Sequence, residues 1–294
     1  MSFLKIVVRL KSIEEIGRIN LQQVDVFGVD GDFSVKKIAY FTLNDIKNIK
    51  QSVIKKEVFV YLNKMIHEAD LEPLEAYLEE LKKIGIDGIV INDLTVYVLA
   101  KKLGIENKII YQPGTMNTDS FSAQYFSEKN ILGITISREI TLEEIMNIAH
   151  TQTKTGFSLI GHGYLDMFYS KRKLLKNYFL HKQIDKSDIM NNKGFRLNEE
   201  MRQDQYYPIL EDEFGSHVFR SKKLISIDEL KILEPILDYF FIERIFMSDE
   251  EYFDSLDLYN NIITKEHFLE KYPDYDSGFY YQRTEKIKGD LDEN

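Results

Sequence analysis

Residues 88–111 have the sequence GIVINDLTVYVLAKKLGIENKIIY, and their pattern decides the expected fold. The apolar run Gly88–Ile91 is typical of a buried strand, Leu94–Leu103 has the apolar spacing of a helix, and Lys108–Tyr111 is a second apolar run. The connections between them are short. The stretch therefore predicts one strand–helix–strand unit of a parallel sheet.

The same alternation runs from the first residues to residue 160. Seven such steps are expected between the strands Phe3–Leu10 and Gly156–Ile160, and Thr141-Leu-Glu-Glu144 has the capping-box spacing that opens a helix over 142–150. Repeated steps of this kind require a parallel sheet with crossover helices, either open or closed. No Gly-x-Gly-x-x-Gly follows the first strand, which weakens a nucleotide-binding open sheet. We therefore expect an α/β fold, a TIM-barrel-like (β/α) barrel.

Composition narrows the chemistry that the chain can carry. The 294 residues include no cysteine, which excludes disulfides, thiolate zinc sites, an ordinary iron–sulfur cluster and a cysteine nucleophile. Because the net charge is −10, contact with a nucleic acid needs a local basic patch. No apolar run reaches the roughly 18 residues of a membrane span, and the N-terminus lacks a signal-peptide pattern. We expect a cytoplasmic protein without a membrane partner.

The regular alternation stops after residue 161. Four segments are expected: the first seven barrel strands in 1–161, an α+β insertion after the seventh strand in 162–222, the last strand and helix of the barrel in 223–262, and a C-terminal tail in 263–294. Within the insertion, Gly194–Leu197 and Gln205–Leu210 can pair as strands. The apolar run Tyr239–Met247 is the expected eighth strand of the barrel.

In a barrel, functional groups follow the carboxyl ends of strands. Ser137-Arg138-Glu139 is such a place, because an arginine held by a glutamate binds a carboxylate or phosphate through two hydrogen bonds. An internal ion pair explains the same residues. His162, between two glycines, is either a general base or a structural, hydrogen-bonded histidine. Glu139 and His162 are the catalytic candidates, and Asn117, Ser137 and Arg138 are expected to bind a ligand at the barrel mouth.

Other polar residues follow expected strands too. Asn92 and Asp93 either reach the barrel mouth or cap the helix that begins at Leu94. Pro113-Gly114 is either a turn or a ligand loop. These alternatives stay open at this stage.

A basic segment follows the seventh strand, on a helix expected over 171–182. Its cations are Lys171, Arg172, Lys173 and Lys176. These cations alternate with aromatic residues, and a surface of this kind contacts phosphates and stacks on bases, so we expect RNA binding here. A solvated charged face of the helix explains the same pattern. The acidic segment 199–213 has the composition of a metal site, but it lacks His-Glu-x-x-His, and a solvated acidic loop is the simpler interpretation.

Seven short motifs occur in order along nearly the whole chain: Pro113–Asn117, Ile136–Ile140, His162-Gly163, Tyr169–Leu175, Arg196–Arg202, Pro208–Asp212 and Phe241–Arg244. Together they resemble the collagenase-like peptidases of unknown catalytic type, peptidase family U32. This resemblance implies a barrel-like N-terminal domain, in agreement with the alternation of strands and helices.

The resemblance also implies a difference. In many members of the family, cysteines after the His-Gly motif and in a Tyr-Ser-Gly-Arg-Cys motif hold an iron–sulfur cluster that serves the hydroxylation of RNA or quinones. The corresponding positions here are Asp166 and Lys173, so no such cluster and no other cofactor is expected. Whether Asp166 binds a metal in place of the cysteine stays open.

Cysteine-poor members resemble the shorter of two paired bacterial proteins for 5-hydroxylation of the tRNA wobble uridine, in which the longer partner keeps the cysteines. We therefore expect an RNA-binding or scaffolding subunit of that system, with tRNA and a longer, cysteine-containing relative as partners. A peptidase with an unrecognised catalytic site is the alternative, although no nucleophile motif supports it. A third interpretation is a non-catalytic site in which Arg138 binds a small carboxylate.

Overall fold

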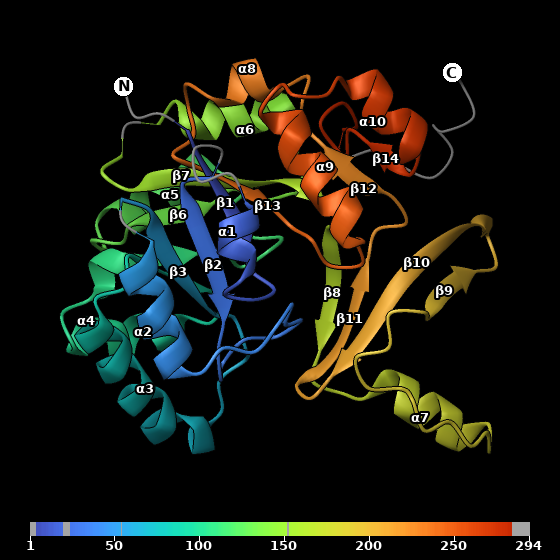
Figure 1. Cartoon of the computed structure of the whole chain (residues 1–294), viewed down its shortest axis with the longest axis horizontal. Helices are drawn as coiled ribbons and strands as arrows, with labels where there is room; N and C mark the ends of the chain where they lie inside the picture. The colour runs from blue at the N-terminus through green and yellow to red at the C-terminus, as the bar shows by residue number, and fades with distance from the viewer. Residues whose placement is uncertain (1–3, 20–23, 54, 152, 284–294) are drawn as a thin grey trace.

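The computed structural model describes residues 4–19, 24–53, 55–151 and 153–283. Parallel strands form a closed barrel, because β13 pairs with both β7 and β1 (Figure 1). In barrel order the strands are β1 (Lys5–Arg9), β2 (Val26–Asp30), β3 (Glu57–Leu62), β4 (Gly88–Ile91), β5 (Ile109–Tyr111), β6 (Gly133–Thr135), β7 (Gly156–Gly163) and β13 (Tyr239–Ile242). The TIM-barrel-like prediction is confirmed.

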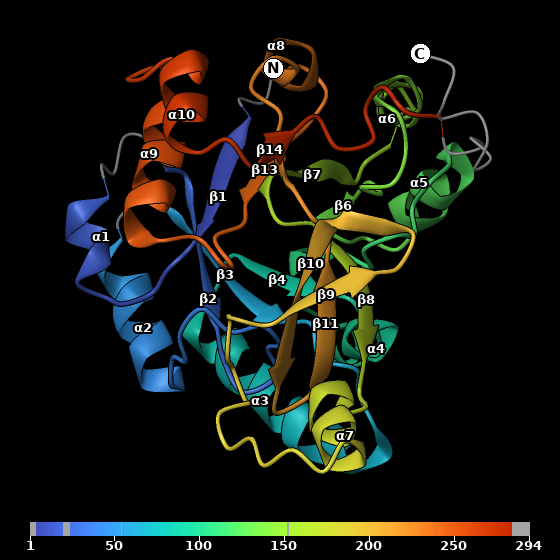
Figure 2. The same cartoon turned by 90° about the vertical axis from the view of Figure 1, so that its right-hand side faces the viewer.

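Helices cover the outside of the barrel (Figures 1 and 2). They are α1 (Glu15–Arg18), α2 (Leu43–Ser52), α3 (Leu71–Ile84), α4 (Leu94–Lys102), α5 (Ser120–Ser127), α6 (Leu142–Ala149), α8 (Leu230–Leu233) and α9 (Asp249–Tyr259), with short 3-10 helices at Glu68–Asp70 and Glu106–Lys108. The predicted capping box is present, since the Thr141 hydroxyl accepts from the Glu144 backbone and the Glu144 carboxylate accepts from the Thr141 backbone.

The expected eighth strand, Tyr239–Met247, is too long, because β13 ends at Ile242. Phe246 has a left-handed φ of 62°, so the chain has left the strand by this point. The apolar run continues because Ile245 is buried against Leu210 and Phe219 of the insertion, in a cluster separate from the barrel core. The first part of this apolar run therefore packs in the barrel core, and Ile245 packs in the smaller cluster with the insertion.

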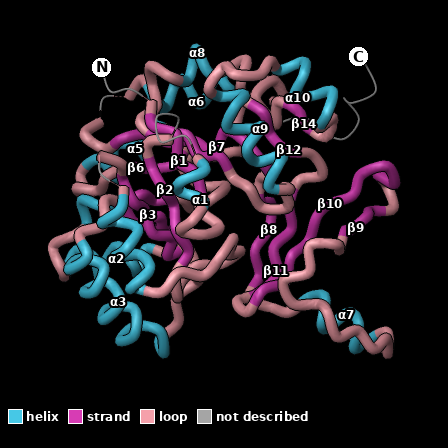
Figure 3. The backbone as a smooth tube through the Cα atoms, viewed as in Figure 1, coloured by secondary structure: helices cyan, strands magenta, loops and turns pink. Residues whose placement is uncertain are grey.

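Between β7 and β13 the chain forms a second, antiparallel sheet beside the barrel (Figures 1 and 3). Its order is β8 (Asp166–Ser170), β11 (Gly215–Phe219), β10 (Arg202–Asp212) and β9 (Arg196–Glu199), and α7 (Leu174–His181) follows β8 in the chain. Leu197 lies opposite Tyr207 and Arg196 opposite Pro208, so the predicted strand pairing within the insertion is confirmed.

The segment expected as a C-terminal tail begins with folded elements. α10 (Lys265–Lys271) is followed by β14 (Tyr275–Asp276), which pairs with β12 (Lys223–Ile225), and β12 in turn pairs with β7. Phe268 and Tyr275 are buried against Ile225 and Leu258. Residues 284–294 of the expected tail, like positions 20 and 21 of a helix expected over 13–21, lie outside the described residues.

In the described part of the chain, no helix combines the length and the apolar character that a membrane span requires.

Strands β7 and β13 are in close contact at Gly161. A Cβ atom built at Gly161 would lie 1.9 Å from a ring carbon of Phe240. Phe240 is fully buried, and its ring centroid lies 5.1 Å from that of Tyr259 on α9. The ring of Phe240 therefore occupies the space that any side chain at residue 161 would need.

Gly161→Ala is expected to lower the free energy of unfolding by about 1–3 kcal/mol, because Phe240 has to leave its packed position. Gly17→Ala is the matched control, since a Cβ there meets no described atom within 4 Å. Urea unfolding followed by circular dichroism measures both variants. A Gly161→Ala protein as stable as the wild type would contradict the tight contact.

Candidate functional site

A pocket of about 480 Å³ lies where the carboxyl ends of the barrel strands face the inserted sheet. Pockets for small ligands in proteins have volumes of roughly 300–1,000 Å³. Polar barrel residues that line it include Arg9, Asn63, Asn92, Gln112, Arg138 and Glu243, and the inserted sheet contributes Asp166, Met167, Phe168, Tyr169, His217 and Phe219. We refer to this space as the mouth pocket.

Arg9, the last residue of β1, is a buried member of the lining. It forms ion pairs with Asp30 of β2 and, at 3.3 Å, with Glu243 after β13, and its guanidinium lies 4.6 Å from the ring centroid of Tyr61. Burial lowers the pKa of Arg9, but the charges of Asp30 and Glu243 outweigh it, so this pKa lies above its ordinary value. Sequence reasoning missed Arg9, although a cation within the apolar run 6–10 was the available signal.

Arg138 lines the mouth pocket, and its ligand-binding role stays a prediction. Its guanidinium packs against Gly114, where a Cβ would lie 2.8 Å from Nη2 and where φ is 88°. The absence of a side chain at Gly114 therefore leaves room for the guanidinium of Arg138. One N–H group of this guanidinium, at Nε, is not used in a hydrogen bond among the described residues.

Ser137, Asn117 and Glu139 lie near Arg138 but are not part of the pocket lining. Ser137 is fully buried; its hydroxyl donates to the Thr115 carbonyl at 3.1 Å and accepts from the Glu139 backbone at 3.2 Å. Asn117 is buried with a left-handed φ of 67°, and its amide donates to the Thr135 carbonyl. Ser137 and Asn117 thus hold the loops that carry Arg138, while the predicted ligand-binding and catalytic roles stay predictions.

His162 is fully buried and is absent from the pocket lining. Its Nε2 lies 2.8 Å from the Ser255 hydroxyl, and its ring stacks on Tyr275 at 5.0 Å. Burial, followed by the charge of Lys223, lowers the pKa of His162 to about 3, so the ring is neutral at pH 7. This geometry is that of the hydrogen-bonded structural histidine, and the general-base role stays a prediction.

The residues after β4 divide between the two roles left open for them. Asp93 caps α4, with its carboxylate accepting from the Thr95 backbone at 2.9 Å. Asn92 lines the mouth pocket, and its Oδ1 is buried without a hydrogen-bond partner among the described residues.

Asp166, at the start of β8, faces the mouth pocket and forms an ion pair with Lys36 from the loop after β2. Burial raises the pKa of Asp166, but the charges of Lys36, Arg138 and His217 outweigh it, so this pKa lies below its ordinary value of 3.8. The carboxylate is therefore charged. Its second oxygen, Oδ1, has no hydrogen-bond partner in the described parts of the chain.

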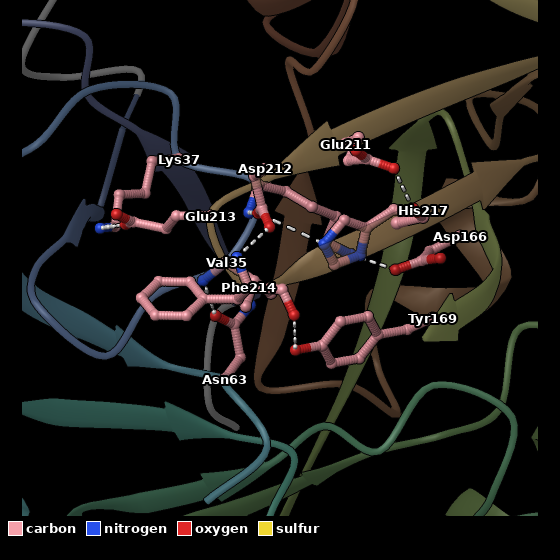
Figure 4. Close-up of polar contacts among 12 residues, drawn as sticks. Val35, Lys37, Asn63, Asp166, Tyr169, Glu211, Asp212, Glu213, Phe214 and His217 are labelled. Atoms are coloured by element: carbon pink, nitrogen blue, oxygen red, sulfur yellow. Dashed lines mark hydrogen bonds and ion pairs between the residues drawn. The ribbon is translucent and has the colours of Figure 1, made fainter. Parts of the chain in front are cut away.

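Asp212, at the end of β10, and His217, on β11, belong to the same network (Figure 4). The Nε2 of His217 lies 3.3 Å from Oδ2 of Asp212, and the imidazole stacks on Tyr169 with ring centroids 4.4 Å apart. Asp212 also accepts from the Lys36 backbone at 2.8 Å. Lys36 is thus bonded to the inserted sheet through both its backbone and its side chain.

The acidic segment 199–213 is not uniformly a solvated loop. Glu199, Glu200 and Asp204 are exposed, but Glu211 and Asp212 are buried. The Glu211 carboxylate accepts from the backbone of Leu175 at 2.8 Å, at the N-terminus of α7, where a negative charge is stabilised. Among the described residues, no group of three or more His, Asp or Glu is placed to hold a metal ion.

The basic segment also divides. Lys171, Arg172 and Lys176 are exposed, whereas Lys173 is half-buried and its ammonium group donates to the Asp212 carbonyl. The expected helix over 171–182 begins later, because α7 starts at Leu174. Burial raises the pKa of Asp70, beside the barrel mouth, but bonding to Lys64 and the smaller effects of other neighbours together outweigh it, so this pKa lies below its ordinary value. The charge of Lys171 makes one of these smaller contributions, so Lys171 lies near Asp70.

Comparison with known proteins gives the family. Residues 25–288 match the model of peptidase family U32. The chain belongs to peptidase family U32. The solved structure of the U32 peptidase Mk0906 superposes with a TM-score of 0.50 at 14% sequence identity, covering 82% of this chain and 93% of that chain, which supports the barrel fold.

Three curated proteins similar to this U32 chain differ in length. The chain is 26% identical over 236 residues to tRNA hydroxylation protein P2 of Bacillus subtilis, covering 79% of this chain and 76% of that protein. It is 25% identical to an uncharacterized protease of Methanocaldococcus jannaschii and 22% identical to tRNA hydroxylation protein P of Escherichia coli. It spans only 60% and 48% of the lengths of those two proteins.

Asp166→Asn is expected to destabilise the protein at pH 7 by roughly 1–3 kcal/mol, because it leaves Lys36 half-buried without its charged partner. Since the pKa of Asp166 is lower in the folded than in the unfolded state, its ionised form stabilises the fold above about pH 4, and this contribution is lost as the pH falls through the folded pKa. The difference between variant and wild type should therefore shrink below pH 4 in urea unfolding.

Glu213→Gln is the matched control. Glu213 forms an ion pair with Lys37, the residue after Lys36, but its side chain is 59% exposed. Exposed pairs contribute about 0–1 kcal/mol, so this variant should stay close to the wild type at every pH. Equal losses in the two variants, or a loss in Asp166→Asn that does not vary with pH, would refute the assigned role of Asp166.

Proposed function

We propose that this chain is a subunit in the 5-hydroxylation of the tRNA wobble uridine, acting through RNA binding or scaffolding rather than through proteolysis. The observation that carries the proposal is the similarity to tRNA hydroxylation protein P2 over 79% of the chain. Similarity to tRNA hydroxylation protein P and to a 23S rRNA 5-hydroxycytidine synthase, both of Escherichia coli, points the same way. Because the proposed role is on tRNA, we also propose that the chain acts in the cytoplasm.

Exposed cations support contact with RNA. Lys171, Arg172 and Lys176 extend into solvent around the start of α7, and Tyr178 on that helix is 52% exposed. Lysine and arginine bind phosphates, while an exposed aromatic ring offers a surface on which a base stacks. Lys173 is not part of this surface, because its ammonium group donates to the Asp212 carbonyl.

The hydroxylation chemistry is proposed to reside in another chain. The iron–sulfur cluster of related proteins needs thiolate ligands, and this chain has no cysteine. At the two positions that the resemblance assigns to cysteines, Asp166 is paired with Lys36, and Lys173 offers an ammonium group that cannot ligate iron. These residues do not fit the cluster. A longer, cysteine-containing member of the family is the partner that we propose.

The peptidase alternative has one geometric feature to consider, the close contact between His162 and Ser255. Both side chains are fully buried, so a peptide bond has no access to them. The Ser255 hydroxyl donates to the Glu251 carbonyl at 2.8 Å, which leaves it as an acceptor toward His162. This pair is a structural contact and does not resemble an activated nucleophile.

Deletion of the gene is expected to abolish or strongly reduce 5-hydroxylated wobble uridine in tRNA, measured by mass spectrometry of tRNA nucleosides. Wild-type protein should restore the modification, and a variant with Lys171, Arg172 and Lys176 all changed to Glu should not. Full modification in a deletion strain without a duplicate gene would exclude the proposal. Cleavage of gelatin or peptides by the purified chain would favour the peptidase alternative instead.

The purified chain is expected to bind tRNA with an affinity that falls as salt rises. Alanine at Lys171, Arg172 or Lys176 should each reduce the slope of log affinity against log salt by about 0.7–0.9, as expected for the loss of one phosphate contact. Lys101→Ala is the control, because this exposed lysine lies near the C-terminal end of α4, away from the carboxyl ends of the strands. An unchanged slope in all three variants would remove the basic segment from the interface.

A further inference from the structure

The lining of the mouth pocket contains polar atoms that the protein itself does not satisfy. Among the described residues, Arg9 Nε, Arg138 Nε, Asn92 Oδ1, Asp166 Oδ1 and both ring nitrogens of His217 are buried without a hydrogen-bond partner, and all five residues line this pocket. The Nε2 of His217 has only its 3.3 Å ion-pair contact with Asp212. Buried polar groups in proteins are normally paired, so such a concentration needs an explanation. The arginine Nε atoms are donors and the oxygens of Asn92 and Asp166 are acceptors, which favours a ligand that can both accept and donate hydrogen bonds.

The charges around the mouth pocket argue against a simple anion as that ligand. The lining has three cationic side chains, Arg9, Lys36 and Arg138, and three carboxylates, Asp93, Asp166 and Glu243. Lys36 is already paired with Asp166, and Arg9 with Glu243. A small carboxylate bound at Arg138 would therefore meet a lining without an excess of fixed positive charge. A neutral ligand with a polar edge fits this balance better.

The remaining surface of the pocket suits a flat ring. Tyr111, Tyr164, Phe168 and Tyr169 all line it. Phe168 is 48% exposed and Met116 is 61% exposed, so part of the lining is apolar surface open to solvent. Aromatic side chains stack on nucleobases, and enzymes that act on a base commonly turn it out of its stack into such a pocket.

The basic segment and the mouth pocket are adjacent. Phe168 and Tyr169 of β8 line the pocket, and Lys171 and Arg172 follow after one intervening residue, Ser170. The charge of Lys171 reaches Asp70, which belongs to the region that follows β3 at the barrel mouth. A strand of RNA whose phosphates contact Lys171 and Arg172 thus has a nucleotide within reach of the pocket.

We propose that the mouth pocket receives a uracil base of the bound tRNA, turned out of its stack, and that Arg138 and Asn92 recognise its polar edge. Uracil presents two carbonyl acceptors on either side of one N–H donor. Arg138 donates to a carbonyl oxygen, and Asn92 Oδ1 accepts the N–H. The inference rests on the proposed function and deepens it, because it makes this chain a subunit that holds the base to be modified as well as one that holds tRNA.

The test compares the binding of two anticodon stem-loop RNAs to the full chain by fluorescence anisotropy. One RNA carries uridine at the wobble position, and the other has an abasic site there. The wild-type chain is expected to bind the uridine RNA about tenfold more tightly, through stacking and hydrogen bonds to the base. Asn92→Leu and Arg138→Gln should bind the two RNAs with nearly equal affinity, while keeping the wild-type affinity for the abasic RNA.

Lys171→Ala is the matched control, since it should weaken the binding of both RNAs by the same factor and leave their ratio unchanged. A ratio measured on one protein preparation is insensitive to partial unfolding, which affects both RNAs alike. Equal affinity of the wild type for the two RNAs, a preference that persists in both pocket variants, or no binding of either RNA would overturn the inference. The proposed function is judged separately, by the modified tRNA of the deletion strain.

Discussion

Closure of the barrel between β7 and β13 is the constraint on which the rest of the structure depends. β13 has to pair with β7 on one side and with β1 on the other, although the whole insertion lies between β7 and β13 in the sequence. The insertion must therefore leave the barrel and return to it at the carboxyl end of β7. Because functional groups of such barrels lie at that end, closure itself places the inserted sheet over the candidate site.

Polar contacts of Lys36 join the inserted sheet to the barrel. Lys36 is bonded to Asp166 through its side chain and to Asp212 through its backbone, while Lys173 is bonded to the Asp212 carbonyl within the insertion itself. Removing one partner from a buried or half-buried pair costs more than the pair contributes, because the other charge is left without compensation. The two positions at which the resemblance places cysteines thus carry opposite charges here, and each has a partner within the protein.

The sequence was sufficient to predict the barrel, the strand pairing within the insertion and the capping box of α6, because each depends on a local pattern of residues. It was insufficient wherever the partner of a residue is distant in the chain. Tyr239–Met247 looked like one strand because it serves two cores in turn, and Glu211 looked solvated because α7, whose N-terminus it caps, lies far from it in sequence. Arg9 shows the same limit, since only the assembled barrel brings it to the pocket that Arg138 also lines.

The barrel mouth separates groups that maintain the fold from groups that are available to a ligand. Arg9 is tied to Asp30 and Glu243 across three strands, so most of its hydrogen-bonding capacity is used in closure. Arg138 and Asn92 line the same pocket, yet among the described residues Arg138 Nε and Asn92 Oδ1 have no partner. Leaving such atoms buried and unpaired lowers stability, and a subunit that only scaffolds gains nothing from it. The cost is understandable if the pocket binds a molecule that satisfies those atoms.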